Sequence, residues 1–179
     1  MNKTYVLAAF LAALTPSLAA AETQGTAPGM FDVREVVVQY ANFGDPKSAD
    51  ACGLGREEIA ARLVKAMTEN GVPATLVANA KPPSIGVARI EAITEITTFN
   101  NQGLDCTSWV SLAVQSRASV HIPPVEVSRN VTIMYWRDGL MLASSQSTHS
   151  RTVEEALDKL AKKFAQQYRL DQPPPLPAQ

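Results

Sequence analysis

The chain has 179 residues, with 16 lysines and arginines against 17 aspartates and glutamates, for a formal net charge of −1. This balance excludes a strongly basic chain of the kind that binds nucleic acid, so we expect no nucleic-acid partner. The length suits one ordinary domain with a sizeable hydrophobic core.

The N-terminus has the pattern of a secretory signal peptide. Lys3 supplies a positive charge, an uncharged and mostly apolar run follows from Tyr5 to Leu14, and small residues lead up to Ala21. Cleavage after Ala21 fits the small-residue rule, and so does cleavage after Ala19. A run of about ten residues is too short for a bilayer core, which needs about twenty. We therefore expect residues 1–21 to be removed and the product to be a soluble periplasmic protein without a stable membrane anchor.

The two cysteines, Cys52 and Cys106, both lie beyond the expected cleavage site. In an exported chain an even number of cysteines predicts a disulfide. A bridge would close a loop of about 54 residues, which chain entropy converts to about 4 kcal/mol of stability. Two free thiols are the alternative. The spacing is not that of a CxxC motif, so neither a redox site nor a metal knuckle is indicated.

The first part of the mature chain predicts a strand between two irregular segments. Residues 22–30 are small and polar and predict a flexible lead-in. Phe31–Tyr40 contains a cluster of β-branched residues, which is typical of a strand. Residues 42–51 contain glycine, aspartate and proline and predict a loop.

A helix is predicted over Arg56–Asn70, because apolar residues recur every four positions along it. Gly71 follows at the position where a left-handed residue ends many helices. Ala74–Ala78 predicts a short strand, and residues 81–84 contain two prolines and predict a linker.

The middle of the chain predicts antiparallel strands. Residues 88–98 alternate between apolar and polar side chains, and residues 106–119 do the same. The sequence Ile122-Pro123-Pro124 interrupts the sheet pattern. Arg137-Asp138-Gly139 then lies between two apolar runs, which predicts a hairpin joining strands 131–136 and 140–144.

The last predicted element is a helix over residues 153–168. Thr152 and Glu155 have the spacing of a capping box at its start. Residues 171–179 are rich in proline and predict a disordered tail, with docking on a partner as the alternative. Residues 31–170 would thus form one α+β domain, in which two helices pack on one face of a mainly antiparallel sheet, in the order β-α-(β)-β-β-β-β-α.

No catalytic, metal or cofactor site is predicted. His121 and His149 lack a second ligand at a metal-binding spacing, and both are expected in surface loops. No serine occupies a nucleophile elbow, and no glycine-rich phosphate loop is present. Glu91 and Glu95 share a strand face but would lie about 13 Å apart, too far for joint acid–base work on one bond. We expect a protein that is not an enzyme.

The candidate partner-binding site is the sheet face opposite the helices. Alternation places Trp109 and Arg117 on this face of one strand and Arg89, Glu91 and Glu95 on that of its neighbour. An exposed tryptophan beside arginine is typical of an interface hot spot. Packing of Trp109 beneath the proline-rich loops is the alternative interpretation.

Two stretches give the chain a resemblance to known envelope domains. Residues 35–46 (EVVVQYANFGDP) lead into a helix that ends at residues 67–72 (MTENGV). This resembles the strand, loop and helix of the TolB amino-terminal and CsgG-like domains, and the order of elements is similar to that of LptE. The chain lacks the lipidation cysteine of CsgG and LptE and the propeller of TolB. The resemblance implies a non-catalytic envelope domain that works by contact with another envelope protein.

Two other functions stay open. A small-ligand carrier would need a pocket between the sheet and the helices, and an enzyme would need His149, a serine and a carboxylate within hydrogen-bond reach. The expected lining of the carrier pocket is apolar and comprises Ile90, Ile96, Leu112, Leu63 and Phe164.

Overall fold

The computed structural model describes residues 29–30, 33–80, 88–101, 104–121 and 128–172. The predicted signal peptide, nearly all of the lead-in, the linker at 81–84, the prolines after residue 121 and the tail from residue 173 lie outside these residues. No helix in the described ranges is both long enough and apolar enough to cross a membrane.

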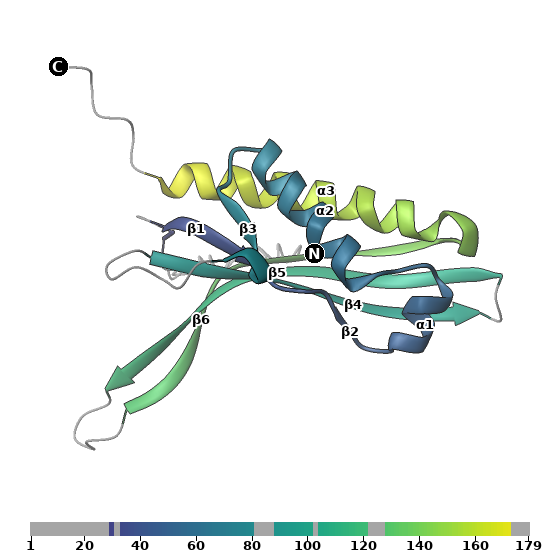
Figure 1. The fold of residues 1–179 in the computed structure, drawn as a ribbon, viewed down its shortest axis with the longest axis horizontal. Helices are drawn as coiled ribbons and strands as arrows, with labels where there is room; N and C mark the ends of the chain where they lie inside the picture. Colours follow the sequence, from purple (N-terminus) through teal and green to yellow (C-terminus); the bar gives the residue numbers. More distant parts are fainter. Residues whose placement is uncertain (1–28, 31–32, 81–87, 102–103, 122–127, 173–179) are drawn as a thin grey trace, which may run out of the picture.

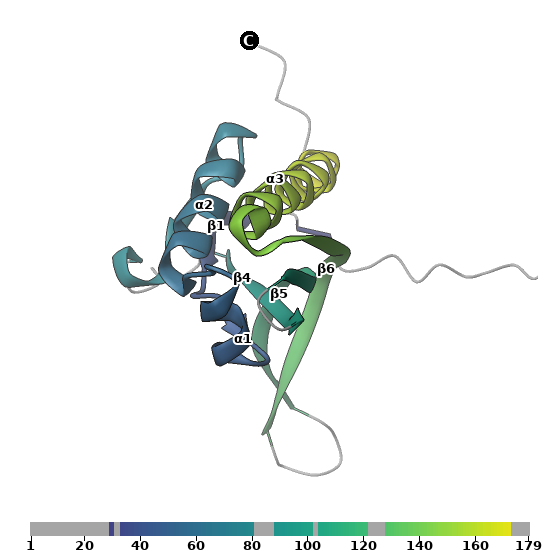
Figure 2. The same cartoon turned by 90° about the vertical axis from the view of Figure 1, so that its right-hand side faces the viewer.

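The fold is α+β, as predicted, with one six-stranded sheet and the helices on one of its faces (Figures 1 and 2). The strand order is β3-β1-β4-β5-β6, and β2 adds to β4 beside β1. The elements are β1 Val33–Val38, β2 Asn42–Phe43, α1 Pro46–Ala51, α2 Arg56–Glu69, β3 Ala74–Leu76, a 3-10 turn Val77–Asn79, β4 Ala88–Asn101, β5 Asp105–His121, β6 Ser128–Ser145 and α3 Gln146–Asp171.

The sheet is mixed and not strictly antiparallel, although its long strands pair antiparallel. β1 pairs in parallel with both β3 and β4, β2 is also parallel to β4, and only β4, β5 and β6 form an antiparallel meander. Val36, Val37 and Val38 are all buried, because β1 lies between two strands in the interior of the sheet. A continuous apolar run is typical of such a strand, whereas the alternation of residues 88–98 belongs to a strand with one open face.

The helix α2 matches its prediction closely. Its buried stripe contains Ile59, Leu63 and Met67, which pack against the sheet. Gly71 follows with a φ of 82°, as expected for a left-handed residue after a helix. The predicted loop at 42–51 was wrong, because it holds β2 and α1. Asp45 caps α1 by accepting a hydrogen bond from the Lys47 backbone N–H at 3.1 Å.

The predicted hairpin at Arg137-Asp138-Gly139 was also wrong, because all three residues lie inside the single long strand β6. β6 pairs with β5 along its whole length, except that Tyr135 is the extra residue of a β-bulge between the Gln115–Met134 and Val114–Trp136 pairs. The glycine is needed for space and not for a turn. A Cβ added at Gly139 would lie 2.5 Å from Cζ2 of Trp109.

The final helix begins seven residues earlier than predicted and directly follows β6. The capping box does not form, since Thr152 lies inside α3 and its hydroxyl donates to the Thr148 carbonyl at 3.1 Å. The buried stripe of α3 includes Leu157, Leu160, Phe164 and Tyr168. Phe164 packs on Trp136 with ring centroids 5.5 Å apart, and the Tyr168 hydroxyl donates to the Val33 carbonyl at 2.8 Å.

The predicted disulfide is present between Cys52 and Cys106. Both residues are fully buried, and the bridge joins the end of α1 to the first residues of β5. It therefore fixes the α1 region to the same end of the meander at which α3 begins, since Cys106 pairs with Ser144 at the end of β6.

Candidate functional site

The antiparallel meander has one covered face and one open face. On β4 and β5 the even-numbered residues from Ile90 to Thr98 and from Cys106 to Val114 are buried beneath the helices. The odd-numbered residues point away from the helices, as alternation requires. Figure 2 shows the helices gathered on one side of these strands. The open face is thus made by three long strands that pair over many residues.

Three large apolar side chains lie exposed close together at one end of this open face. Trp109 of β5 is 44% exposed, and Met141 of β6, its direct cross-strand partner, is 73% exposed. Phe99 of β4 is 69% exposed and lies two residues beyond Thr97, which is the partner of Trp109 on the other side. We call Phe99, Trp109 and Met141 the open-face patch. Each of the three strands contributes one side chain to it.

The indole of Trp109 lies over the backbone of β6. Its ring occupies the volume in which a side chain at position 139 would begin. The ring therefore packs directly on the backbone of Gly139. Ser111, two residues along β5 and opposite Gly139, is only 2% exposed although it faces the open side. Its hydroxyl has no hydrogen-bond partner among the described residues. The small residues at these positions allow a large ring to lie flat on the sheet.

An ion pair between two oppositely charged side chains lies next to the open-face patch. Arg137 of β6 donates to Glu95 of β4 at 3.1 Å across the intervening strand β5. The pair can span β5 because Ala113 and Ser111 beneath it are small and buried. Both charged side chains are about half exposed, so their interaction contributes little stability.

The five predicted site residues do not converge on one place. Trp109 and Glu95 lie near the open-face patch, but Glu91 pairs with Gln115 further along the meander. Arg117, which is exposed, lies eight residues beyond Trp109, or about 26 Å at the rise of a strand. Arg89 is only partly exposed and donates from Nε to Glu35 of the neighbouring strand β1 at 2.8 Å. Its contacts therefore include a cross-strand ion pair.

Sequence reasoning missed Phe99, Met141 and Arg137. Phe99 continues the odd-numbered alternation of β4 beyond the predicted end of that strand at residue 98, so extending the alternation would have found it. Met141 and Arg137 were hidden by the wrong hairpin, which assigned Arg137 to the turn and Met141 to the strand that follows it. Only the continuous pairing of β6 with β5 places these two residues on one strand, and the local sequence carries no signal for that pairing.

His149 is fully buried, so the prediction of a surface histidine was wrong. It lies in the first turn of α3, where its Nε2 is 2.8 Å from the Ser108 hydroxyl and its Nδ1 is 2.8 Å from the Ser144 hydroxyl. Ser108 also bonds to Thr98 at 2.8 Å. Burial lowers the pKa of the imidazole below its usual value, which keeps the ring neutral.

This histidine and its serines do not form an accessible catalytic site. Ser108 is fully buried with His149, and among the described residues the ring nitrogens are hydrogen-bonded to hydroxyls and not to a carboxylate. These hydrogen bonds give the buried polar side chains their partners, and they connect the first turn of α3 to β5 and β6. In the part of the chain that the structure describes, no group of three acidic, histidine or cysteine side chains is arranged to hold a metal.

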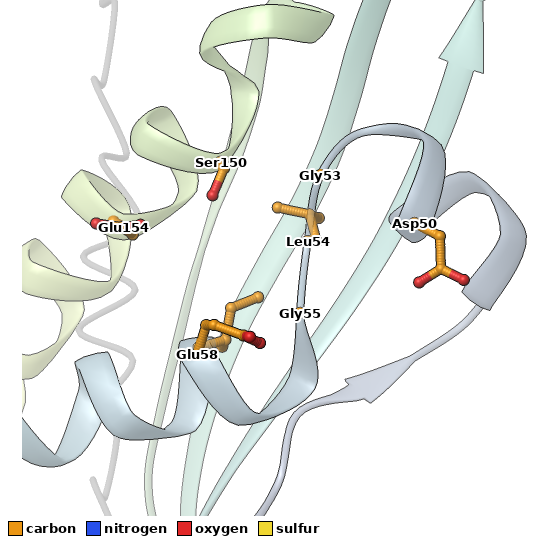
Figure 3. Close-up of a pocket in the computed structure, with 8 residues that line it drawn as sticks. Asp50, Gly53, Leu54, Gly55, Glu58, Ser150 and Glu154 are labelled. Carbon is orange, nitrogen blue, oxygen red and sulfur yellow. The ribbon is translucent and has the colours of Figure 1, made fainter.

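A pocket of about 360 Å³ lies where α1, α2 and α3 meet (Figure 3). Its lining includes carboxylates from all three helices, namely Asp50, Glu58 and Glu154. The pocket does not lie between sheet and helices, where the carrier hypothesis needs it. The five apolar residues expected to line a carrier pocket are at most 1% exposed and pack together in the core: Ile90, Ile96, Leu112, Leu63 and Phe164.

Comparison with known proteins shows no family. No protein-family description matches the chain, and no curated protein matches it. Solved structures that are similar include a PelC dodecamer from Paraburkholderia phytofirmans, with 8% identity, a TM-score of 0.47 and coverage of 76% of this chain and 92% of that one. A minor lipoprotein from Acinetobacter baumannii shares 12% identity, with a TM-score of 0.33 and coverage of 76% and 91%. A hypothetical protein from Chlamydia trachomatis also shares 12% identity, with a TM-score of 0.34 and coverage of 77% and 95%. These scores are too low to assign a function.

Proposed function

We propose that this chain is an exported, non-catalytic protein of the bacterial cell envelope that binds another envelope protein through its open-face patch. The observation that carries the proposal is the patch itself. Phe99, Trp109 and Met141 are 69%, 44% and 73% exposed on adjacent strands of one face. Large apolar side chains gathered on one surface mark interaction sites more often than single exposed ones do.

The support beneath the patch suits a binding surface. Trp109 is held over Gly139, so its ring is ordered before any partner arrives. The strands that present it are paired on both sides of β5, and the disulfide at Cys106 lies three residues away from it. Preorganised aromatic side chains lose little conformational entropy on binding, which favours affinity.

The polar groups near the patch also suit protein contact. The ion pair between Glu95 and Arg137 lies next to the apolar cluster and is half exposed. Such a border resembles the polar rim that surrounds the apolar centre of many interfaces. The long-range disulfide and the signal-peptide pattern together favour a protein that works in an oxidising compartment.

The experiment is site-specific photo-crosslinking in the native host. A benzophenone amino acid replaces Phe99 in one variant and Lys162 in another. Lys162 is exposed on α3, on the helix side of the sheet, and serves as the matched control. We expect a discrete adduct from position 99, identified by mass spectrometry as an envelope protein, and a weaker adduct when Trp109 is also replaced by alanine. Equal adducts from both positions, or none from position 99, would refute the proposal.

A further inference from the structure

The strand β6 forms one edge of the sheet, and its outer side carries no strand among the described residues. Natural proteins protect such edges with charged side chains, prolines or bulges. β6 has a bulge at Tyr135 and charges at Arg137 and Asp138, but Gly139–Ser145 has none of these devices. These seven residues are uncharged, contain no proline and lie beside the open-face patch, to which they contribute Met141.

The hydrogen-bond pattern shows which backbone groups of this segment point outward. The Gln146 N–H donates to the Leu104 carbonyl at 3.3 Å, which makes this pair a hydrogen-bonded one at the end of the β5–β6 ladder. In an antiparallel ladder bonded and non-bonded pairs alternate, so even-numbered residues of β6 after the bulge bond to β5. The odd-numbered residues Met141 and Ala143 therefore direct their N–H and C=O groups away from β5. Ser145 does so with its N–H, whereas its carbonyl accepts from the Thr148 hydroxyl at the start of α3.

Gly139 agrees with this assignment. Its N–H, which would also point outward, is bonded to the side chain of Asp138 at 2.7 Å and not to β5. The outer edge after the bulge thus offers a regular series of backbone donors and acceptors.

We propose that β6 pairs with β6 of a second copy of this chain, antiparallel and across a two-fold axis at Met141, to form one continuous sheet. This axis pairs Met141 with its own copy, Gly139 with Ala143 and Arg137 with Ser145. All of these are outward-facing odd-numbered residues. Their five pairs would form about ten hydrogen bonds once the Gly139 N–H and the Ser145 carbonyl exchange their present partners, Asp138 and Thr148, for the second copy. An axis at Leu142 would give only four such pairs and would leave Arg137 unpaired.

The side chains fit this pairing on both faces. On the open face the two copies of Met141 would be neighbours, flanked by the two copies of Trp109, so that sulfur and aromatic groups form one row. On the helix face Leu140 would lie beside Leu142 of the other copy. No residue would face a like charge, because Arg137 meets Ser145 and Asp138 meets Ser144.

The helices fit as well. α3 packs on both β5 and β6, and Figure 1 shows that it runs lengthwise along β5. Pairing across the edge would place the two α3 helices two strand spacings apart, or about 10 Å. This separation lies at the upper end of the usual distance between packed helices, so neither a clash nor a gap results.

The proposal extends the proposed function but can fail separately from it, because the first concerns self-association and the second a different partner. The test is sedimentation velocity on the purified mature protein over a concentration series, with the variants Met141→Lys and Met134→Lys. Met141 is 73% exposed, so lysine is tolerated in the single chain but would face its own copy at the axis. Met134 lies on the same strand and face before the bulge, 40% exposed, and outside the pairing.

We expect a dimer for the wild type and for Met134→Lys, and a monomer for Met141→Lys at the same concentration. A second measurement uses Met141→Cys, whose thiol would be the single free one, since both native cysteines are bridged. A hydrogen-bonded antiparallel pair places the two Cα atoms about 5.5 Å apart, within disulfide range, so mild oxidation should give a covalent dimer. Met134→Cys should not. A wild type that stays monomeric, or a dimer that survives Met141→Lys, overturns the proposal.

Discussion

The buried His149 predicts that the fold loses stability as the pH falls from 7.5 to 5. In the folded protein burial lowers the pKa of the imidazole, whereas in the unfolded chain the ring has its ordinary pKa of 6.5. Below pH 6.5 the unfolded state binds a proton that the folded state does not. Folding stability is therefore complete above this pH and falls as the pH drops toward the folded-state pKa.

The magnitude follows from proton linkage. Each pH unit over which only the unfolded state is protonated costs about 1.4 kcal/mol, so the loss between pH 7.5 and 5 is at most about 2 kcal/mol. Protonation would also reverse one of the two hydrogen bonds of the ring, because the hydroxyl that donates to the neutral ring would have to turn and accept from the new N–H.

The assay is urea unfolding of the mature protein at several pH values, followed by circular dichroism. The matched variant is His149→Gln, because an amide can donate and accept hydrogen bonds but does not titrate in this range. We expect the variant to be less stable than the wild type at pH 7.5, with the difference shrinking as the pH falls. If wild type and variant have the same pH dependence, the assignment of a neutral, buried histidine is wrong.

Three further outcomes are expected. Replacing both cysteines by alanine should lower the free energy of unfolding by about 4 kcal/mol in urea titrations, because the bridge closes a loop across a sequence separation of 54; a loss below about 1 kcal/mol would contradict this. Gly139→Ala should cost about 1–3 kcal/mol by forcing the Trp109 ring aside, and the cost should largely vanish in a Trp109→Ala background. Arg137→Gln should change stability by less than about 1 kcal/mol, since its ion pair with Glu95 is half exposed.

The elements that sequence reasoning found are those with a local cause. The four-residue spacing of Ile59, Leu63 and Met67 determines α2, and Gly71 ends it. The disulfide was predictable because a signal-peptide pattern favours oxidised cysteines and two cysteines have a single possible pairing. These features depend on neighbours in the chain or on simple counting.

The features that sequence reasoning missed depend on distant contacts. Asp138-Gly139 has the local preference of a turn, but pairing with β5 and the Trp109 ring above Gly139 keep the segment extended. The local sequence around His149 is that of a polar loop. Its burial depends on the fold, which places the Ser108 and Ser144 hydroxyls beside its two ring nitrogens. The parallel pairing of β1 likewise follows from the tertiary arrangement, since its apolar run fits any buried strand.

The sequence predicted one part of the candidate site and missed another, depending on whether the cause was local or distant. Alternation alone placed Trp109 on the open face, because period two is a local property of a strand. Met141 could not be assigned to the same patch without the register between β5 and β6, which brings residues 32 positions apart into contact.

The most direct test of the proposed binding site is the affinity of the envelope partner, once crosslinking from position 99 has identified it, for wild type and two variants. Trp109→Ala removes the centre of the open-face patch, and Leu170→Ala removes an equally accessible apolar side chain from α3, which is 79% exposed. We expect at least a tenfold loss of affinity for Trp109→Ala, the size of a hot-spot effect, and no change for Leu170→Ala. Equal affinity of wild type and Trp109→Ala would contradict it.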